Sequence, residues 1–125
     1  MEIQIVDSWG NIVRVNTAIG CFNGVWCSSS PAVAKSYIVE LDSDDVLTPD
    51  AVELSNFSKP WIAYVDQTIN ITGLVEEVQD EVIILRLQNS LMMLEISSKL
   101  DFVQYVGCYV HVRLSEIKLY DTGIY

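Results

Sequence analysis

His111 is the only histidine among the 125 residues, so any catalytic site built on a histidine must use it. A Ser-His-Asp or Cys-His site needs its nucleophile within hydrogen-bonding reach of the imidazole. Alternation predicts a strand here whose core face carries Cys108, Val110, Val112 and Leu114. The other face carries Tyr109, His111 and Arg113, without a nucleophile. We therefore expect a solvent-facing histidine within a protein-binding surface, because arginine and aromatic residues are enriched at binding hot spots.

The densest group of carboxylates comprises Asp42, Asp44, Asp45, Asp50 and Glu53. A calcium loop of the EF-hand type needs a glycine at its sixth position and a glutamate at its twelfth. Counted from Asp42, the glutamate is present as Glu53, but Leu47 stands where the glycine belongs. We expect no metal site. The alternatives are a docking surface for a basic partner, centred on Asp42, Asp44 and Asp45, or an ordinary solvated loop.

A second acidic cluster surrounds a predicted hairpin tip and consists of Glu76, Glu77, Asp80 and Glu81. Nucleic-acid binding needs positive charge combined with stacking aromatic residues. The seven basic residues are instead scattered, at Arg14, Lys35, Lys59, Arg86, Lys99, Arg113 and Lys118. The pattern favours a basic protein as partner and excludes a nucleic-acid strand.

Trp9 is a candidate anchor for such a partner, because Asp7–Asn11 has the composition of a turn and turns lie at the surface. The C-terminal residues 120–125 are a second candidate contact.

Composition narrows the class of protein further. Seven basic and 17 acidic residues give a net charge of −10, which opposes binding to phosphate backbones. Half of the residues are hydrophobic, which is too many for a disordered acidic tail. No apolar run reaches the roughly 18–20 residues of a membrane span. Phosphate-binding loops, dinucleotide fingerprints and hydrolase or metalloprotease motifs are absent, so we expect no cofactor.

The cysteines and the N-terminus indicate a compartment. Cys21, Cys27 and Cys108 are an odd number and lack a metal-binding spacing, so we expect buried free thiols, although a Cys21–Cys27 bridge is conceivable. The N-terminus has no basic segment followed by an apolar one, the pattern of a secretory signal. We expect a cytoplasmic protein.

The second half of the chain predicts five strands, over residues 69–78, 82–88, 91–96, 109–114 and 117–120, because apolar and polar residues alternate. Asp80-Glu81 and Asn89-Ser90 supply the hairpin turns. A helix over residues 98–106, with Leu100, Val103 and Val106 on its packed face, is expected between the third and fourth strands.

In the first half, residues 2–6 and 12–16 predict a hairpin and 37–41 a further strand, whereas 20–31 fits either a bulged strand or a long loop. A second helix is predicted after Thr48 as N-cap and Pro49 as first helical residue, ending before Lys59. Neither a linker nor an internal repeat is evident. We expect one β-rich domain over residues 1–125, in which the part of the chain before Trp61 extends or covers a barrel.

Residues 68–120 resemble an OB-fold barrel in strand order. The likeness rests on Gly73-Leu74-Val75 in a long first strand and on Gly107 just ahead of Tyr109–Val112. An SH3-like barrel or a small sandwich would give a similar pattern. The fold class expected is mainly β, a small barrel or sandwich with one or two short helices.

In size, acidity and lack of catalytic groups, the chain resembles the small acidic immunity proteins of bacterial toxin systems. That resemblance implies an inhibitor that binds a basic, nucleic-acid-targeting toxin. The inhibitor would block the active site of the toxin and would perform no chemistry of its own. The two acidic clusters would attract the toxin, and Trp9 and Tyr109 would anchor it. The alternative is a structural or regulatory subunit of a bacterial assembly, which would associate with itself as a homodimer; an enzyme using paired carboxylates is the third hypothesis.

Overall fold

The computed structural model describes residues 1–29 and 32–123, and its fold is mainly β. The strands are β1 (Glu2–Trp9), β2 (Ile12–Thr17), β3 (Gly20–Trp26), β4 (Ser36–Asp42), β5 (Val46–Leu47), β6 (Val52–Leu54), β7 (Trp61–Val65), β8 (Thr68–Gln79), β9 (Val82–Leu87), β10 (Ser90–Ile96), β11 (Tyr109–Leu114) and β12 (Lys118–Asp121). The helical segments are the 3₁₀ turns η1 (Pro49–Ala51) and η2 (Val103–Tyr105) and the short helix α1 (Lys99–Phe102).

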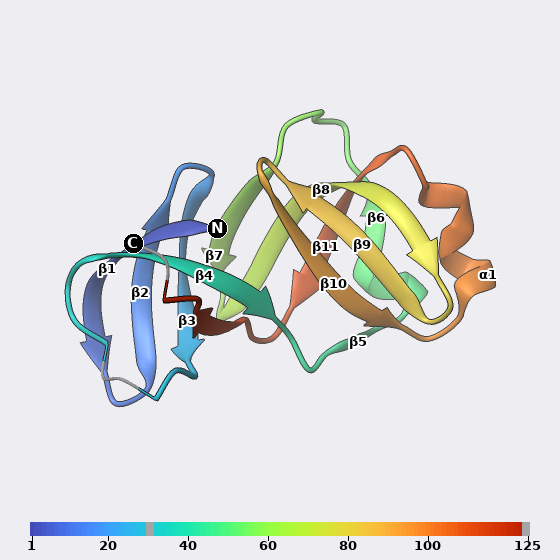
Figure 1. Ribbon diagram of the computed structural model, residues 1–125. Coiled ribbons are helices and arrows are strands. Elements are labelled where there is room, and N and C mark those ends of the chain that lie inside the picture. The colour runs from blue at the N-terminus through green and yellow to red at the C-terminus, as the bar shows by residue number, and fades with distance from the viewer. Residues whose placement is uncertain (30–31, 124–125) are drawn as a thin grey trace.

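Five strands form a closed barrel in the first half of the fold (Figure 1). β1, β2 and β3 form an antiparallel meander, and β4 pairs antiparallel with β1. The last strand, β12, closes the ring, because it pairs antiparallel with β4 and parallel with β3. The segment 20–26, which the sequence left open between strand and loop, is therefore a strand of this barrel.

The second half repeats this arrangement. β8, β9 and β10 form a meander, and β11 pairs antiparallel with β8. β5 pairs parallel with β10, and β6, which follows it after Thr48 and η1, pairs antiparallel with β11. The two circuits lie beside each other in Figure 1.

The two halves match at a constant offset in residue number. The second strands begin at Ile12 and Val82 and the third at Gly20 and Ser90, and the offset is the same in both cases (82 − 12 = 90 − 20). The register also shifts between Ile5 and Asp7 in β1 and, at this same offset, between Val75 and Glu77 in β8. The expectation that the chain has no internal repeat is therefore wrong. The repeat lies in strand lengths and bulges rather than in residue identities, which hid it in the sequence.

Each half receives its closing segment from the other half. The segment that follows β4 closes the second circuit, and β12, which follows β11, closes the first. The predicted order of three strands, a helix and two strands is present over residues 68–121. Its last strand, however, joins the other barrel. Each closing segment makes one parallel and one antiparallel pairing: β12 with β3 and β4, and the β5–β6 segment with β10 and β11. The exchange therefore keeps the same pairing pattern in both halves and links them to each other.

The predicted helix after Pro49 ends at Ala51. Thr48, Pro49 and Asp50 do start a helical turn, but Val52 is buried and pairs with Val112 of β11. Because the barrel needs a closing strand there, tertiary pairing overrides the local helix signal. The later helix covers nearly the predicted range, but only Lys99–Phe102 is α-helical and Val103–Tyr105 is a 3₁₀ turn.

In that later helix, the face carrying Leu100, Val103 and Val106 is exposed, not packed, and the exposed fraction of Leu100 is 84%. Phe102, which is fully buried, anchors the segment instead, and Tyr105 packs beside it.

Candidate functional site

The structure distributes the sequence-predicted residues over separate places. Asp42, Asp44 and Asp45 lie where the exchanged segments cross, whereas Glu76, Glu77, Asp80 and Glu81 lie on the β8–β9 hairpin. Tyr109, His111 and Arg113 occupy β11. Trp9 ends β1, where 47% of its side chain is exposed. Of the C-terminal contact predicted at residues 120–125, residues 124–125 lie outside the described residues.

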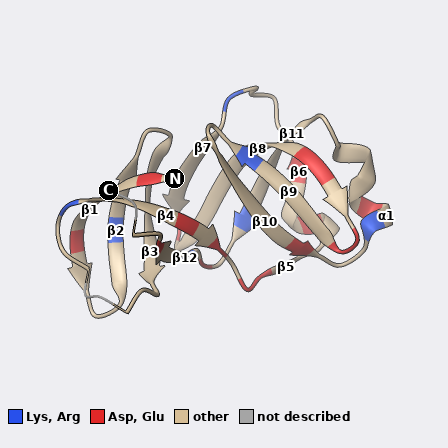
Figure 2. Cartoon of the chain, viewed as in Figure 1, with Lys and Arg blue, Asp and Glu red and all other residues tan. Residues whose placement is uncertain are grey.

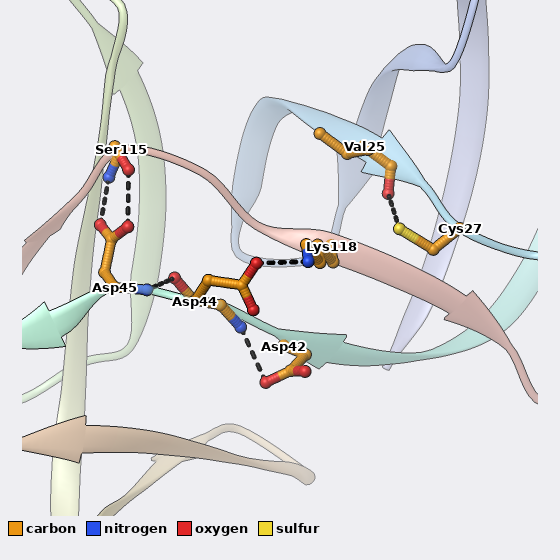
Figure 3. A network of polar contacts seen from close by, with 8 residues as sticks. Val25, Cys27, Asp42, Asp44, Asp45, Ser115 and Lys118 are labelled. Atoms are coloured by element: carbon orange, nitrogen blue, oxygen red, sulfur yellow. Dashed lines mark hydrogen bonds and ion pairs between the residues drawn. The ribbon is translucent and has the colours of Figure 1, made fainter.

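The three aspartates at the crossing are engaged within the chain (Figure 3). The Asp45 carboxylate accepts hydrogen bonds from the backbone N–H and the hydroxyl of Ser115, both at 2.6 Å. Asp44 pairs with Lys118 of β12, an interaction that raises the pKa of the lysine above its ordinary value. Asp42 accepts the N–H of Ser43 at 2.9 Å. The contacts of Asp44 and Asp45 join the segments leading into β5 and β12 and so fasten the exchange, whereas that of Asp42 is local.

His111 is held between two neighbours on β8. Its Nδ1 lies 3.4 Å from the Thr72 hydroxyl, and its Nε2 lies 3.1 Å from the side-chain oxygen of Asn70. The Trp61 ring packs against the imidazole, with centroids 5.9 Å apart. The sequence predicted a solvent-facing residue, but His111 is half-buried and bonded at both nitrogens, because β8 is its neighbour in the barrel.

The order of this cluster resembles that of a catalytic triad, in which Thr72 would be the nucleophile, His111 the base and Asn70 the residue that orients the base. The Thr72 side chain is only 1% exposed, however, so a substrate could not reach its hydroxyl. Both ring nitrogens bridge β8 to β11, and the cluster acts as a clamp between these strands.

Arg113 lies on the outer face of β11 and contacts the segment that closes the second circuit. Its guanidinium donates to the backbone oxygen of Asp50 and lies 3.7 Å from the Glu53 carboxylate. Tyr109 is half-buried and pairs with Leu74 in the register of β8. The outward alternation predicted for this strand is present, but these contacts engage Arg113 within the fold.

The hairpin carboxylates are more open. Glu76 pairs with Arg86 across the β8–β9 ladder. Asp80 adopts a positive φ of 52° in the turn, a conformation that Asp tolerates better than most residues. Asp80 and Glu81, together with Glu95 of β10 and Lys99, line a shallow hollow of about 710 Å³. Within the described residues, no cluster of His, Cys, Asp or Glu has the geometry to hold a metal ion.

A groove between the two halves was missed by sequence reasoning. It has a volume of about 670 Å³ and lies between β4 and the beginning of β10. Its β4 wall carries the exposed carboxylates of Glu40 and Asp42, and its β10 wall carries the exposed side chains of Leu91 and Met93. Their exposed fractions, 52% and 65%, are high for apolar residues.

The available sequence signal for this groove was the run Leu91–Leu94. A strand with one wet face should alternate apolar and polar residues, and this run is apolar on both faces. Met92 and Leu94 fill the core, so Leu91 and Met93 must point outward.

The three cysteines are free in the described structure. The expectation of buried thiols is wrong for Cys21, which is exposed because the alternation of β3 turns Phe22 into the core instead. Cys27 and Cys108 are half-buried.

The chain matches no protein-family model, no curated protein and no solved structure. Among the described residues, no helix is long and apolar enough to cross a membrane.

Proposed function

We propose that the protein is a binding protein without chemistry of its own, which captures a basic protein partner through its acidic surface. The finer assignment that we propose is a cytoplasmic immunity protein, which neutralises a basic, nucleic-acid-targeting bacterial toxin by covering its active site. The observation that carries the proposal is the groove wall of Glu40 and Asp42, which faces exposed Leu91 and Met93.

The distribution of charge supports a basic partner. Glu76, Glu53 and Asp44 pair with Arg86, Arg113 and Lys118, and seven basic residues cannot neutralise 17 acidic ones. Figure 2 shows acidic residues along β4, along the connection from β4 to β5 and at the end of β10. A surface of one sign raises the association rate with a partner of the opposite sign.

The surroundings of His111 also favour binding over catalysis. Both of its ring nitrogens have partners within the chain, and the nearest hydroxyl is buried. A rigid, strand-exchanged scaffold that presents charge and apolar side chains suits an inhibitor, because a preorganised surface loses little conformational entropy on binding.

Co-expression tests this function. The basic protein encoded by the neighbouring gene is expressed with this protein and, separately, with its Glu40→Lys/Asp42→Lys variant. We expect restored growth only with the unchanged protein. An Asp7→Lys/Asp101→Lys variant makes the same charge change at exposed residues that do not line the groove and should still protect. Absence of toxicity in the neighbouring protein, or equal protection by all three forms, would contradict the proposal.

The second candidate is a subunit of a larger assembly. Leu54, the last residue of β6, and Phe57, just beyond it, are 61% and 69% exposed, and an apolar surface of this kind is typical of protein interfaces. A stable homodimer at micromolar concentration, without capture of a basic partner, would favour this function.

A further inference from the structure

The edge of β3 shows how this fold accepts an added strand. Gly20, the first residue of β3, pairs in parallel with Ile62 of β7, and the Ile62 N–H donates to the Ile19 oxygen at 2.8 Å. The approach is so close that a Cβ atom on Gly20 would lie 1.8 Å from the Ile62 oxygen. β7 thus covers an edge that β12 reaches only at Val25 and Trp26.

Within residues 1–29 and 32–123, the equivalent edge in the second half carries no paired strand over residues 90–94, although Cα atoms of β4 approach those of β10 to within 8 Å. Ser90, the counterpart of Gly20 in the repeat, begins β10, and the closing strand β5 pairs with this strand only at Glu95 and Ile96. On this edge of residues 90–94, no strand is paired within the described part of the chain. Among the described strands, β7 has no counterpart beside β10. An unpaired row of N–H and C=O groups is a template for another strand.

The walls of this position define what could occupy it. Asn89, Ser90, Leu91 and Met93 line one side of the groove, and Val39–Asp42 line the other. Beyond Ile38, β4 no longer pairs with β1, so its edge over Glu40–Asp42 also faces the groove. Along this wall the carboxylates of Glu40 and Asp42 are exposed and Leu41 points to the core. A cation that lines the groove is the Met1 amino group, which donates to the Val39 oxygen at 2.7 Å.

We propose that an extended segment of a basic protein, with Lys or Arg alternating with apolar residues, adds as a strand to the open edge of β10 and lies in this groove. Successive side chains of a strand point to opposite sides, so such a segment directs its apolar residues onto Leu91 and Met93 and its cations toward Glu40 and Asp42. It runs parallel to the beginning of β10, as β7 does beside β3. This inference rests on the proposed function, because it names the part of the basic partner that the protein grips.

The test uses a fluorescein-labelled peptide in which Lys and Val alternate. Binding is followed by anisotropy and by amide NMR shifts of the full chain, which carries any tag at its C-terminus because Met1 lines the groove. A Glu-Val peptide tests the charge. A Lys-Val peptide N-methylated at alternate residues tests backbone pairing, because it cannot donate along one edge. We expect the Lys-Val peptide alone to bind and to shift the amides of residues 89–93.

Two variants locate the site. Met93→Glu and Glu40→Lys alter exposed groove residues, and each should weaken the Lys-Val peptide at least about tenfold, the effect of roughly 1.4 kcal/mol. Asp101→Lys makes the same charge change as Glu40→Lys at an exposed residue of α1 that does not line the groove, and it should weaken binding less than about threefold.

The outcomes separate this inference from the proposed function. Equal loss in Glu40→Lys and Asp101→Lys, undiminished binding of the N-methylated peptide, or a second copy of the chain in the groove would each overturn strand addition. The proposed function would survive the first two results, provided that the basic neighbour is still captured. Groove binding by the peptide without capture of that neighbour would uphold strand addition and overturn the toxin assignment.

Discussion

Asp45 illustrates how a residue expected at a binding surface can instead hold the fold. The sequence presented it as one of several carboxylates in a solvated or docking loop, because local composition cannot reveal a partner far away along the chain. In the structure both carboxylate oxygens are occupied by Ser115. This contact links the two exchanged segments, so Asp45 belongs to the fold rather than to a surface that attracts a partner.

Replacement of Asp45 by alanine removes both hydrogen bonds to Ser115. We expect a loss of about 1–3 kcal/mol in the free energy of unfolding, the usual range for hydrogen bonds that include a charged group. Asp45→Asn, which keeps one acceptor, should lose less. Denaturant unfolding measures both, with Glu77→Ala as the control for loss of an exposed carboxylate. Equal stability of all three variants would contradict the fastening role.

The ion pair of Lys118 and Asp44 has a defined pH dependence. The hydrogen bond to Asp44 raises the pKa of Lys118 above its ordinary value of 10.5, so the folded state holds this proton more tightly than the unfolded state. The stabilisation is complete below pH 10.5 and is lost as the pH rises through the higher pKa of the folded protein.

The Tm difference between the unchanged protein and Lys118→Met should accordingly be constant near neutral pH and disappear in strongly alkaline solution. A difference that grows with alkaline pH would have the wrong sign. At acidic pH Asp44 itself becomes protonated, so the Tm in that range is compared separately with that of the Asp44→Asn variant.

At the scale of elements, the strands of the second half could be predicted because a barrel strand with one wet face alternates in polarity. Tyr109–Leu114 was predicted with the bounds that the structure has. The helix predicted after Thr48 was wrong beyond its first turn, since Pro49 and Asp50 are local signals whereas the pairing of Val52 with Val112 is long-range. The groove escaped prediction for a related reason, because an open strand edge is defined by which strand fails to pair. The sequence alone predicts where strands lie, but it does not predict which strand edges stay unpaired.

Gly20 and Ser90 form a matched pair for testing the covered and open edges. Gly20→Ala places a methyl group against the Ile62 oxygen, and Gly20 also has a φ of 139°, so we expect a loss of at least about 1–3 kcal/mol. Ser90→Ala at the equivalent position should change stability by less than about 0.5 kcal/mol. Thermal unfolding of both variants checks this. A tolerated Gly20→Ala would show that β7 does not rest on this edge.

At the scale of the whole molecule, the exchange makes each half depend on the other. Residues 1–57 contain β1 to β6 but lack β12, and residues 58–125 contain β7 to β12 but lack β5 and β6. Neither fragment can complete its own circuit with the pairings of the full chain. The exchange was not predictable, because the closing segments pair in the same manner in either half.

The two fragments should therefore be largely unfolded alone and form a one-to-one complex when mixed. Circular dichroism and size-exclusion chromatography follow this reassembly. A fragment that folds stably as a monomer would show that a half can close on its own segment.

The same dependence makes the molecule a stiff support for its acidic surface, which matches the proposed capture of a basic protein. The most direct test of that central claim is the association rate of the chain with the basic product of the neighbouring gene, measured at increasing salt. We expect rapid binding at low salt, and the rate should fall steeply as the Debye length shrinks from about 30 Å at 0.01 M to about 8 Å at 0.15 M. Glu40→Lys/Asp42→Lys should flatten that dependence. A rate independent of salt, or no complex at any salt concentration, would contradict the account.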